Sequence, residues 1–228
     1  MTARDIRMVN VSCLDIIYTE RNEKSVACND NKGVTMIRKL GLLFLLFSLA
    51  TTANAAWQLD NSNSWLSFLF VKKQDTAEVG KFKRLSGKVD DNGKAQLKID
   101  LASVDTNILI RDERMQAFLF QTLQYPYATL TADFPIDKIN KLAVGEMMVQ
   151  PVSVQLDFHG AKQDINGNVV VTRLAEDRLL VVSQTVLFVK AAYFDLVKGI
   201  DILRGLAGLP RISSVVSVSF VFTFKKRQ

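Results

Sequence analysis

Apolar and polar residues alternate over most of the chain after residue 65. Between Ala95 and Leu101 every second residue is apolar, and Gln96, Lys98 and Asp100 stand between them. Successive side chains of a β-strand point to opposite faces, so this pattern predicts a strand that buries one face. A similar alternation occurs in four further segments, at 66–70, 130–134, 152–158 and 216–224.

Two short segments indicate tight turns, and two longer ones break the alternation. Asp90–Gly93 (DDNG) predicts a hairpin turn before the strand at 95–101, and Ile165–Asn168 (INGN) predicts another turn. At 111–124 and 195–210 the apolar residues have helical spacing instead. The sequence therefore predicts an all-β antiparallel domain of about eight or nine short strands with two helical insertions, a closed barrel or a sandwich.

Phenylalanine occurs on nearly every predicted strand. An eight-stranded barrel has room inside for packed side chains or for one small ligand. The alternation alone does not separate these two arrangements, so a packed aromatic core and an apolar cavity both remain open.

Residues 36–55 have the three parts of a signal peptide. The positive pair Arg38-Lys39 precedes an uncharged apolar run at Leu40–Ala50, and the segment ends with the small residues Ala-Asn-Ala. The run is well short of the about 20 residues of a membrane-spanning helix, which disfavours the alternative of an uncleaved anchor. The sequence thus predicts export, cleavage after Ala55 and a mature domain at 56–228.

Residues 1–35 show no clear period and no turn pattern. A signal peptide stands at the N-terminus of a precursor, so 35 residues before one are unexpected. We expect translation to start at Met36, and residues 1–35 to be a mis-assigned upstream extension.

The composition of residues 56–228 excludes several classes of function. Both cysteines, Cys13 and Cys28, lie upstream, so the predicted mature domain has no disulfide, thiolate nucleophile or thiolate metal ligand. It carries 22 Lys and Arg against 18 Asp and Glu, and these are scattered except for Lys225-Lys226-Arg227. A nucleic-acid-binding protein would show a clustered basic stripe with aromatic residues, so we expect no nucleic-acid partner.

The predicted mature domain has one candidate catalytic side chain, His159, at the end of a predicted strand. A Ser-His-Asp site would use such an imidazole, but no G-x-S-x-G nucleophile motif accompanies it. One histidine with scattered carboxylates is also a poor zinc or iron site. We therefore expect His159 to be an exposed turn residue, with no enzymatic activity, no metal and no resident cofactor.

A dense group of charges lies between Asp105 and Arg114. Asp112 and Glu113 stand beside Arg111 and Arg114 at the start of the predicted helix. One interpretation is a polar anchor or gate for a ligand head group. The other is local, because acids favour a helix N-terminus and the arginines would pair with them.

Four segments carry a resemblance to a known family. They are WQLDNSNSWLSFLFVKK, VGKFKRLSGKV, ASVDTNILIRDERMQAFLFQTLQYPYATLTAD and VGEMMVQPVSVQLDFHG. Together they resemble the YceI-like family, exported lipocalin-like proteins associated with polyisoprenoid binding. The series SVDTN, RDERM, F and YP is the most specific part, because order, spacing and residue types agree.

The resemblance implies an extended lipocalin-like barrel with an apolar tunnel for a polyprenyl lipid or a quinone tail. It also implies a periplasmic location. We expect the inward stripe to line the tunnel through Phe68, Phe70, Leu97, Ile99, Leu130, Phe134, Leu156, Phe158, Phe220 and Phe222. Met115 and Phe118 would cover the mouth, with Arg111 and Arg114 near a polar head.

Three other classes of function remain as alternatives to a lipid carrier. They are a packed interaction or stress-response barrel without lipid, a hydrolase built around His159, and an outer-membrane barrel, against which the helical insertions argue. The sequence leaves room for transient contact with a membrane and for a homodimer.

Overall fold

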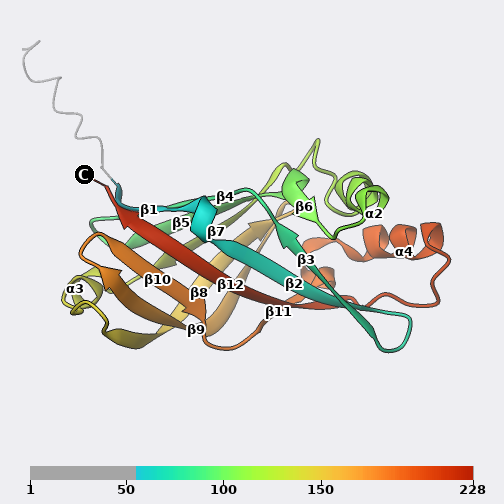
Figure 1. Ribbon diagram of the computed structural model, residues 1–228. Coiled ribbons are helices and arrows are strands. Elements are labelled where there is room, and N and C mark those ends of the chain that lie inside the picture. The colour runs from blue at the N-terminus through green and yellow to red at the C-terminus, as the bar shows by residue number, and fades with distance from the viewer. Residues whose placement is uncertain (1–54, 228) are drawn as a thin grey trace, which may run out of the picture. The chain divides into compact units, whose positions relative to one another are not determined.

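The strands form one sheet in the computed structural model, which describes residues 55–227 (Figure 1). All pairs are antiparallel, and β12 returns to pair with β1, which closes the sheet. The strands are β1 (Ala55–Leu59), β2 (Trp65–Lys72), β3 (Thr76–Phe82), β4 (Leu85–Asp90), β5 (Lys94–Asp100), β6 (Val104–Asp105), β7 (Tyr127–Asp133), β8 (Met147–Phe158), β9 (Ala161–Ala175), β10 (Arg178–Ser183), β11 (Leu187–Lys190) and β12 (Val215–Lys226).

The wall of the barrel has eight positions, because several of these strands are interrupted segments of one passage. β1 and β2 pair with the same side of β12, and β10 and β11 pair with its other side. β3 and β4 form a third interrupted passage, and β6 lies outside the closed wall, on β3. The predicted all-β, closed antiparallel barrel of about eight strands is confirmed.

Helices lie at the two ends of the barrel. α2 (Leu109–Arg114) continues into a π-helical turn, η3 (Met115–Leu119), and stands beside α4 (Val197–Leu206) at one end. α3 (Ile136–Asn140) lies at the opposite end (Figure 1). Short 3₁₀ turns are η1 (Asn61–Asn63), η2 (Leu101–Ser103) and η4 (Ala191–Phe194). Both predicted helical insertions are present, but the first ends at residue 119 rather than 124.

The two predicted turns had different outcomes. Asp90–Gly93 does connect β4 to β5. The prediction at Ile165–Asn168 was wrong, because these residues lie inside β9, whose residues 161–172 pair with the whole of β8. The turn between the two strands is at His159–Gly160. Gly167 leaves room for the side chain of Leu187 rather than forming a turn, since a Cβ there would lie 2.6 Å from Cδ2 of Leu187.

Inward-facing residues of the strands form the core, as the alternation predicted. One cluster of buried side chains surrounds Phe68, Leu97 and Leu156, and a second surrounds Trp57 and Val171 near α3. Among residues 55–227, no helix is long and apolar enough to cross a bilayer.

Candidate functional site

A cavity of about 470 Å³ runs through the barrel. Its wall is almost entirely aliphatic and aromatic, and the four charged residues on it, Lys72, Lys88, Arg111 and Arg114, are all cations. The structure brings all ten side chains predicted from the inward stripe to this wall, namely Phe68, Phe70, Leu97, Ile99, Leu130, Phe134, Leu156, Phe158, Phe220 and Phe222. The interior is therefore hollow, and the contact of these side chains with a ligand stays a prediction.

Aromatic rings form a nearly continuous row along one part of the wall. Phe70, Phe68, Phe82, Phe120 and Phe158 follow one another with ring centroids 5.4 to 6.1 Å apart. Tilted pairs at this spacing are favourable beyond the area that they bury. The row gives the cavity a stiff apolar surface without a hydrogen-bonding group.

Buried Trp57 closes the α3 end of the cavity, and Arg173 packs against its ring from outside the cavity wall. Both side chains are buried, and the Arg173 guanidinium lies 5.6 Å from the Trp57 ring centroid. The guanidinium also donates to the carbonyl of Ile139 in α3 over 2.9 Å and to that of Glu176 over 3.1 Å. Arg173 thus ties β9, the turn after β9, α3 and the first strand together below the cavity.

The opposite end, between α2 and α4, carries three of the four cations of the wall. Arg111 of α2 and Lys72 of β2 both pair with Glu78 of β3. The hydrogen bond from Lys72 and the paired Arg111 lower the pKa of the Glu78 carboxyl below its usual value of 4.5. One carboxylate thus stands between two cations, and the group keeps a net positive charge.

The charged group at 105–114 is not paired within itself as the local interpretation expected. Arg111 pairs with Glu78 and donates to Thr106, while buried Asp112 accepts from the backbone N–H of Thr106 over 2.9 Å. Asp105 pairs instead with lysines of the β3 region. The sequence placed the charges together correctly, but the partner of Arg111 lies on a strand 33 residues away, which local spacing does not reveal.

The four residues predicted for the mouth divide into two groups. Arg111, Arg114 and Met115 line the cavity, and Met115 is buried. Nη1 of Arg114 lies 3.4 Å from the carbonyl oxygen of Leu206 and so links α2 to α4. Phe118 is not on the wall: its ring is exposed and its backbone oxygen faces α4. The helical spacing suggested the right helix, but the π-helical turn rotates Phe118 outward.

The family model for the YceI-like domain matches residues 57–224, which is nearly the whole described barrel. The chain belongs to the YceI-like family. It is also similar to the structure of a polyisoprenoid binding domain from Saccharophagus degradans, described as implicated in plant cell wall breakdown. The two are 41% identical with a TM-score of 0.75, over 76% of this chain and 100% of that one.

A second structure similar to this YceI-like domain is BcnA of Burkholderia cenocepacia. It is 21% identical with a TM-score of 0.56, over 72% of this chain and 98% of that one, which is a likeness of fold. A comparison with curated proteins gives no match. The family resemblance expected from the four sequence segments is therefore confirmed.

His159 is buried in the YceI-like domain, so the expectation of an exposed turn residue was wrong. Nδ1 lies 3.1 Å from the carbonyl oxygen of Phe194, and the ring packs on Tyr125 at 4.3 Å. A Ser-His-Asp site would have a carboxylate in place of this carbonyl. In the described part of the chain, no group of three His, Cys, Asp or Glu side chains has the arrangement of a metal site.

Sequence reasoning missed several residues of the cavity. Phe82 and Phe120 belong to the aromatic row, and Trp57 lies on the cavity wall at the α3 end. In β3 only Gly80 and Phe82 are buried, and two alternating positions are too few to predict a strand from the sequence. Phe120 follows a π-helical turn, for which helical spacing gives the wrong face.

Proposed function

We propose that this protein is a binding or carrier protein that holds a long apolar isoprenoid-type lipid inside its barrel without covalent chemistry. The ligand would be a polyprenyl lipid or carry a quinone tail. The observation that carries the proposal is the cavity, which is apolar along its wall, closed at α3 and bordered by cations between α2 and α4. Its likeness to a polyisoprenoid binding domain that is 41% identical supports the choice of ligand.

The barrel has the depth that a long chain requires. β12 has 12 residues, which at about 3.3 Å per residue extend about 40 Å. A strand tilt of about 40° leaves a depth of about 30 Å along the axis. A linear chain fits such a space better than a compact ring system does, which favours a prenyl chain.

Burial of the chain would supply the affinity. Each methylene removed from water contributes about 0.8 kcal/mol, so a chain of several isoprene units offsets its ordering cost. The polar end of the ligand would then lie at the α2–α4 end, because the guanidiniums of Arg111 and Arg114 are there. The closed end contributes packing of the tail against Trp57.

We also propose that the protein works in the periplasm. The signal-peptide pattern at 36–55 supports this, together with the expected start at Met36 and cleavage after Ala55; these residues, except Ala55 itself, lie outside the described part. Exchange of the lipid would bring the protein into transient contact with a membrane, and pairing of two chains stays a prediction. A binding role, rather than an enzymatic one, agrees with the carbonyl partner of His159.

The test is a charged substitution in the wall. The whole chain is expressed, released by osmotic shock, purified and extracted with organic solvent, and the extract is measured by lipid mass spectrometry. Leu156→Arg should abolish the copurified lipid, since Leu156 is buried on the wall. Gln155→Arg, one residue away on the outer face of β8, should keep it.

Circular dichroism separates loss of lipid from loss of fold. A folded Leu156→Arg protein that carries as much lipid as the unchanged protein would contradict the proposed binding site. If Leu156→Arg does not fold, Leu130→Asn at a half-buried wall position provides the same comparison.

A further inference from the structure

Apolar side chains at the open end continue from the cavity onto the outer surface. Ile108 and Ile110 both line the cavity and are 45% and 52% exposed, and Leu109 between them is 75% exposed. Three consecutive exposed apolar residues are unusual on a soluble surface and mark an interaction site. The wall of the cavity and the outer surface are thus one apolar surface here.

α4 extends this surface. Val197, Ile202 and Leu206 of this helix are exposed, while its residues Ile200 and Leu203 line the cavity. α4 packs closely against η3, the turn that continues α2, since a Cβ on Gly199 would lie 2.6 Å from the backbone oxygen of Phe118 (Figure 1). We call the exposed set the mouth patch: Ile108, Leu109, Ile110, Val197, Ile202 and Leu206.

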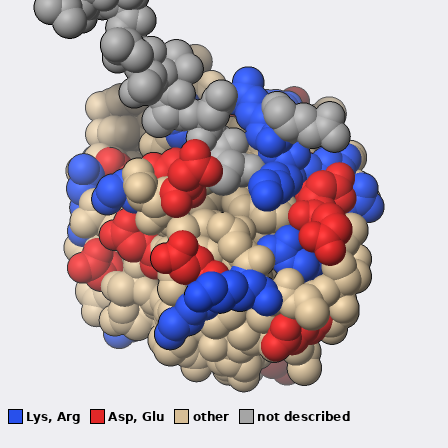
Figure 2. Space-filling view, turned by 90° about the vertical axis from the view of Figure 1, so that its left-hand side faces the viewer, with Lys and Arg blue, Asp and Glu red and all other residues tan. Residues whose placement is uncertain are grey.

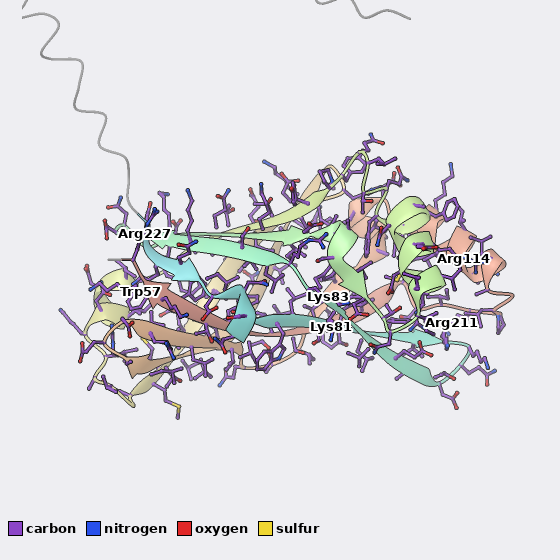
Figure 3. All side chains as sticks on the ribbon, turned by 45° about the horizontal axis from the view of Figure 1, so that its top comes forward. Trp57, Lys81, Lys83, Arg114, Arg211 and Arg227 are labelled. Carbon is purple, nitrogen blue, oxygen red and sulfur yellow. The ribbon has the colours of Figure 1, made fainter. Side chains whose placement is uncertain are left out.

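Cations border the mouth patch. Arg114 and Arg211 both lie at this end of the barrel (Figure 3), and neither takes part in an ion pair among residues 55–227. Arg111 and Lys72 share the single carboxylate of Glu78. Lys72, Arg111 and Arg114 line the cavity at this end, and no Asp or Glu of the described chain lines it.

We infer that the mouth patch docks onto the surface of a bilayer that contains anionic phospholipids. Its apolar side chains lie in the boundary between head groups and acyl chains, and Arg114 and Arg211 lie at the level of the phosphates. An isoprenoid chain then passes between the bilayer and the cavity without crossing water. This inference rests on the proposed function, since a barrel that holds a membrane lipid has to exchange it with a membrane.

Charge complementarity favours a bilayer over a second copy of this chain. A twofold contact through the mouth patch would bring Arg114, Arg211 and the Arg111–Lys72 pair of one copy against the same cations of the other. Like charges across an interface are unfavourable, whereas a phosphate surface attracts all of them.

The experiment measures binding to vesicles. The protein, purified after expression of the whole chain, is sedimented with vesicles of phosphatidylcholine alone and of phosphatidylcholine with about a third phosphatidylglycerol. We expect binding to the anionic vesicles and weaker binding to the neutral ones. Binding to anionic vesicles should weaken as the salt rises from about 0.1 M to 1 M, because the Debye length shortens about threefold.

Two matched double variants test whether the mouth patch is the surface that binds the vesicles. Leu109→Glu with Leu206→Glu places two carboxylates in the mouth patch, at positions 75% and 45% exposed and outside the cavity wall. Met147→Glu with Leu174→Glu makes the same change at positions 69% and 45% exposed on β8 and β9, toward the α3 end. The first should weaken vesicle binding by at least about tenfold, and the second by less than about twofold.

The remaining outcomes overturn the inference. Equal loss in both double variants, or equal binding to neutral and anionic vesicles, contradicts docking through this surface. Detection by analytical ultracentrifugation of a homodimer that dissociates in the mouth-patch variant alone would instead assign the surface to a second copy of the chain. Lipid extraction runs in parallel: unbound vesicles with a lipid-loaded protein refute docking alone, whereas a protein without lipid refutes the proposed function.

Discussion

The two ends of the barrel differ in what their polar groups do. At the α3 end, Arg173 is buried. Its guanidinium donates hydrogen bonds to two backbone carbonyls and packs on the ring of Trp57. At the α2–α4 end, Arg111 and Arg114 reach the cavity wall and stand among exposed apolar side chains. The first arrangement stabilises a closed end, and the second leaves cations beside an opening.

The outer surfaces of the two ends differ as well. Figure 2 looks onto the α3 end, where acidic and basic side chains alternate around the rim. Exposed residues there include Asp137, Lys138, Glu176 and Arg178. Such a mixed charged surface keeps an end soluble, whereas the mouth patch combines isoleucine and leucine with cations. Under the proposed function, the α3 end would face water and the α2–α4 end would exchange the ligand.

The largest expected effect is at the closed end. Trp57→Ala should lower the free energy of unfolding by about 3–5 kcal/mol, because a fully buried indole leaves a cavity that the strands cannot refill. Trp65→Ala, at a 52% exposed position on β2, is the matched control and should cost less than about 1 kcal/mol. Denaturant titration measures both, and equal losses would contradict a special role for the closed end.

A smaller effect is expected where α4 meets η3. Gly199→Ala should destabilise the protein by about 1–3 kcal/mol, since the added Cβ would lie 2.6 Å from the Phe118 oxygen. Gly205→Ala in the same helix has no atom within 4 Å of the added Cβ and should be neutral or stabilising by up to about 1 kcal/mol. Thermal unfolding compares them; a Gly199→Ala protein as stable as Gly205→Ala would mean that α4 is not held against η3.

The ion pairs of Glu78 predict a pH dependence at the open end. Because the pKa of Glu78 is lowered in the folded protein, its stabilisation is present above the unfolded value of 4.5 and is lost as the pH falls through the folded pKa. Glu78→Gln should therefore cost about 1 kcal/mol at pH 7 and progressively less below pH 4.5.

Stability curves of both proteins at several pH values check this prediction. Glu113→Gln, at an exposed position of α2 without an ion pair among residues 55–227, should change stability little at any pH. A Glu78→Gln deficit that stays constant down to pH 3 would show that packing, rather than charge, is responsible.

The smallest effect concerns Arg114. Arg114→Gln removes the guanidinium that links α2 to Leu206, and it should change stability by less than about 0.5 kcal/mol. It should raise the rate of lipid release about twofold, because a hydrogen bond across the mouth is lost. Transfer of a fluorescent prenyl lipid to vesicles measures the rate; an unchanged rate would place the exit elsewhere.

The sequence predicted the wall of the cavity better than its ends. Inward positions follow a period of two, so Phe68, Leu97 and Leu156 could be assigned from the alternation. The ends depend on contacts between distant segments, such as Arg173 with Ile139 and Arg111 with Glu78. No local pattern marks those partners, and the π-helical turn changed the orientation of Phe118.

Native mass spectrometry of the intact protein measures whether the cavity holds one isoprenoid chain. Protein released by osmotic shock is sprayed from a volatile buffer without organic solvent, and its mass is compared with that of the denatured chain. We expect a mass increase equal to one prenyl lipid or quinone, which Leu156→Arg removes and Gln155→Arg keeps. A folded protein whose native mass equals that of the bare chain would contradict it.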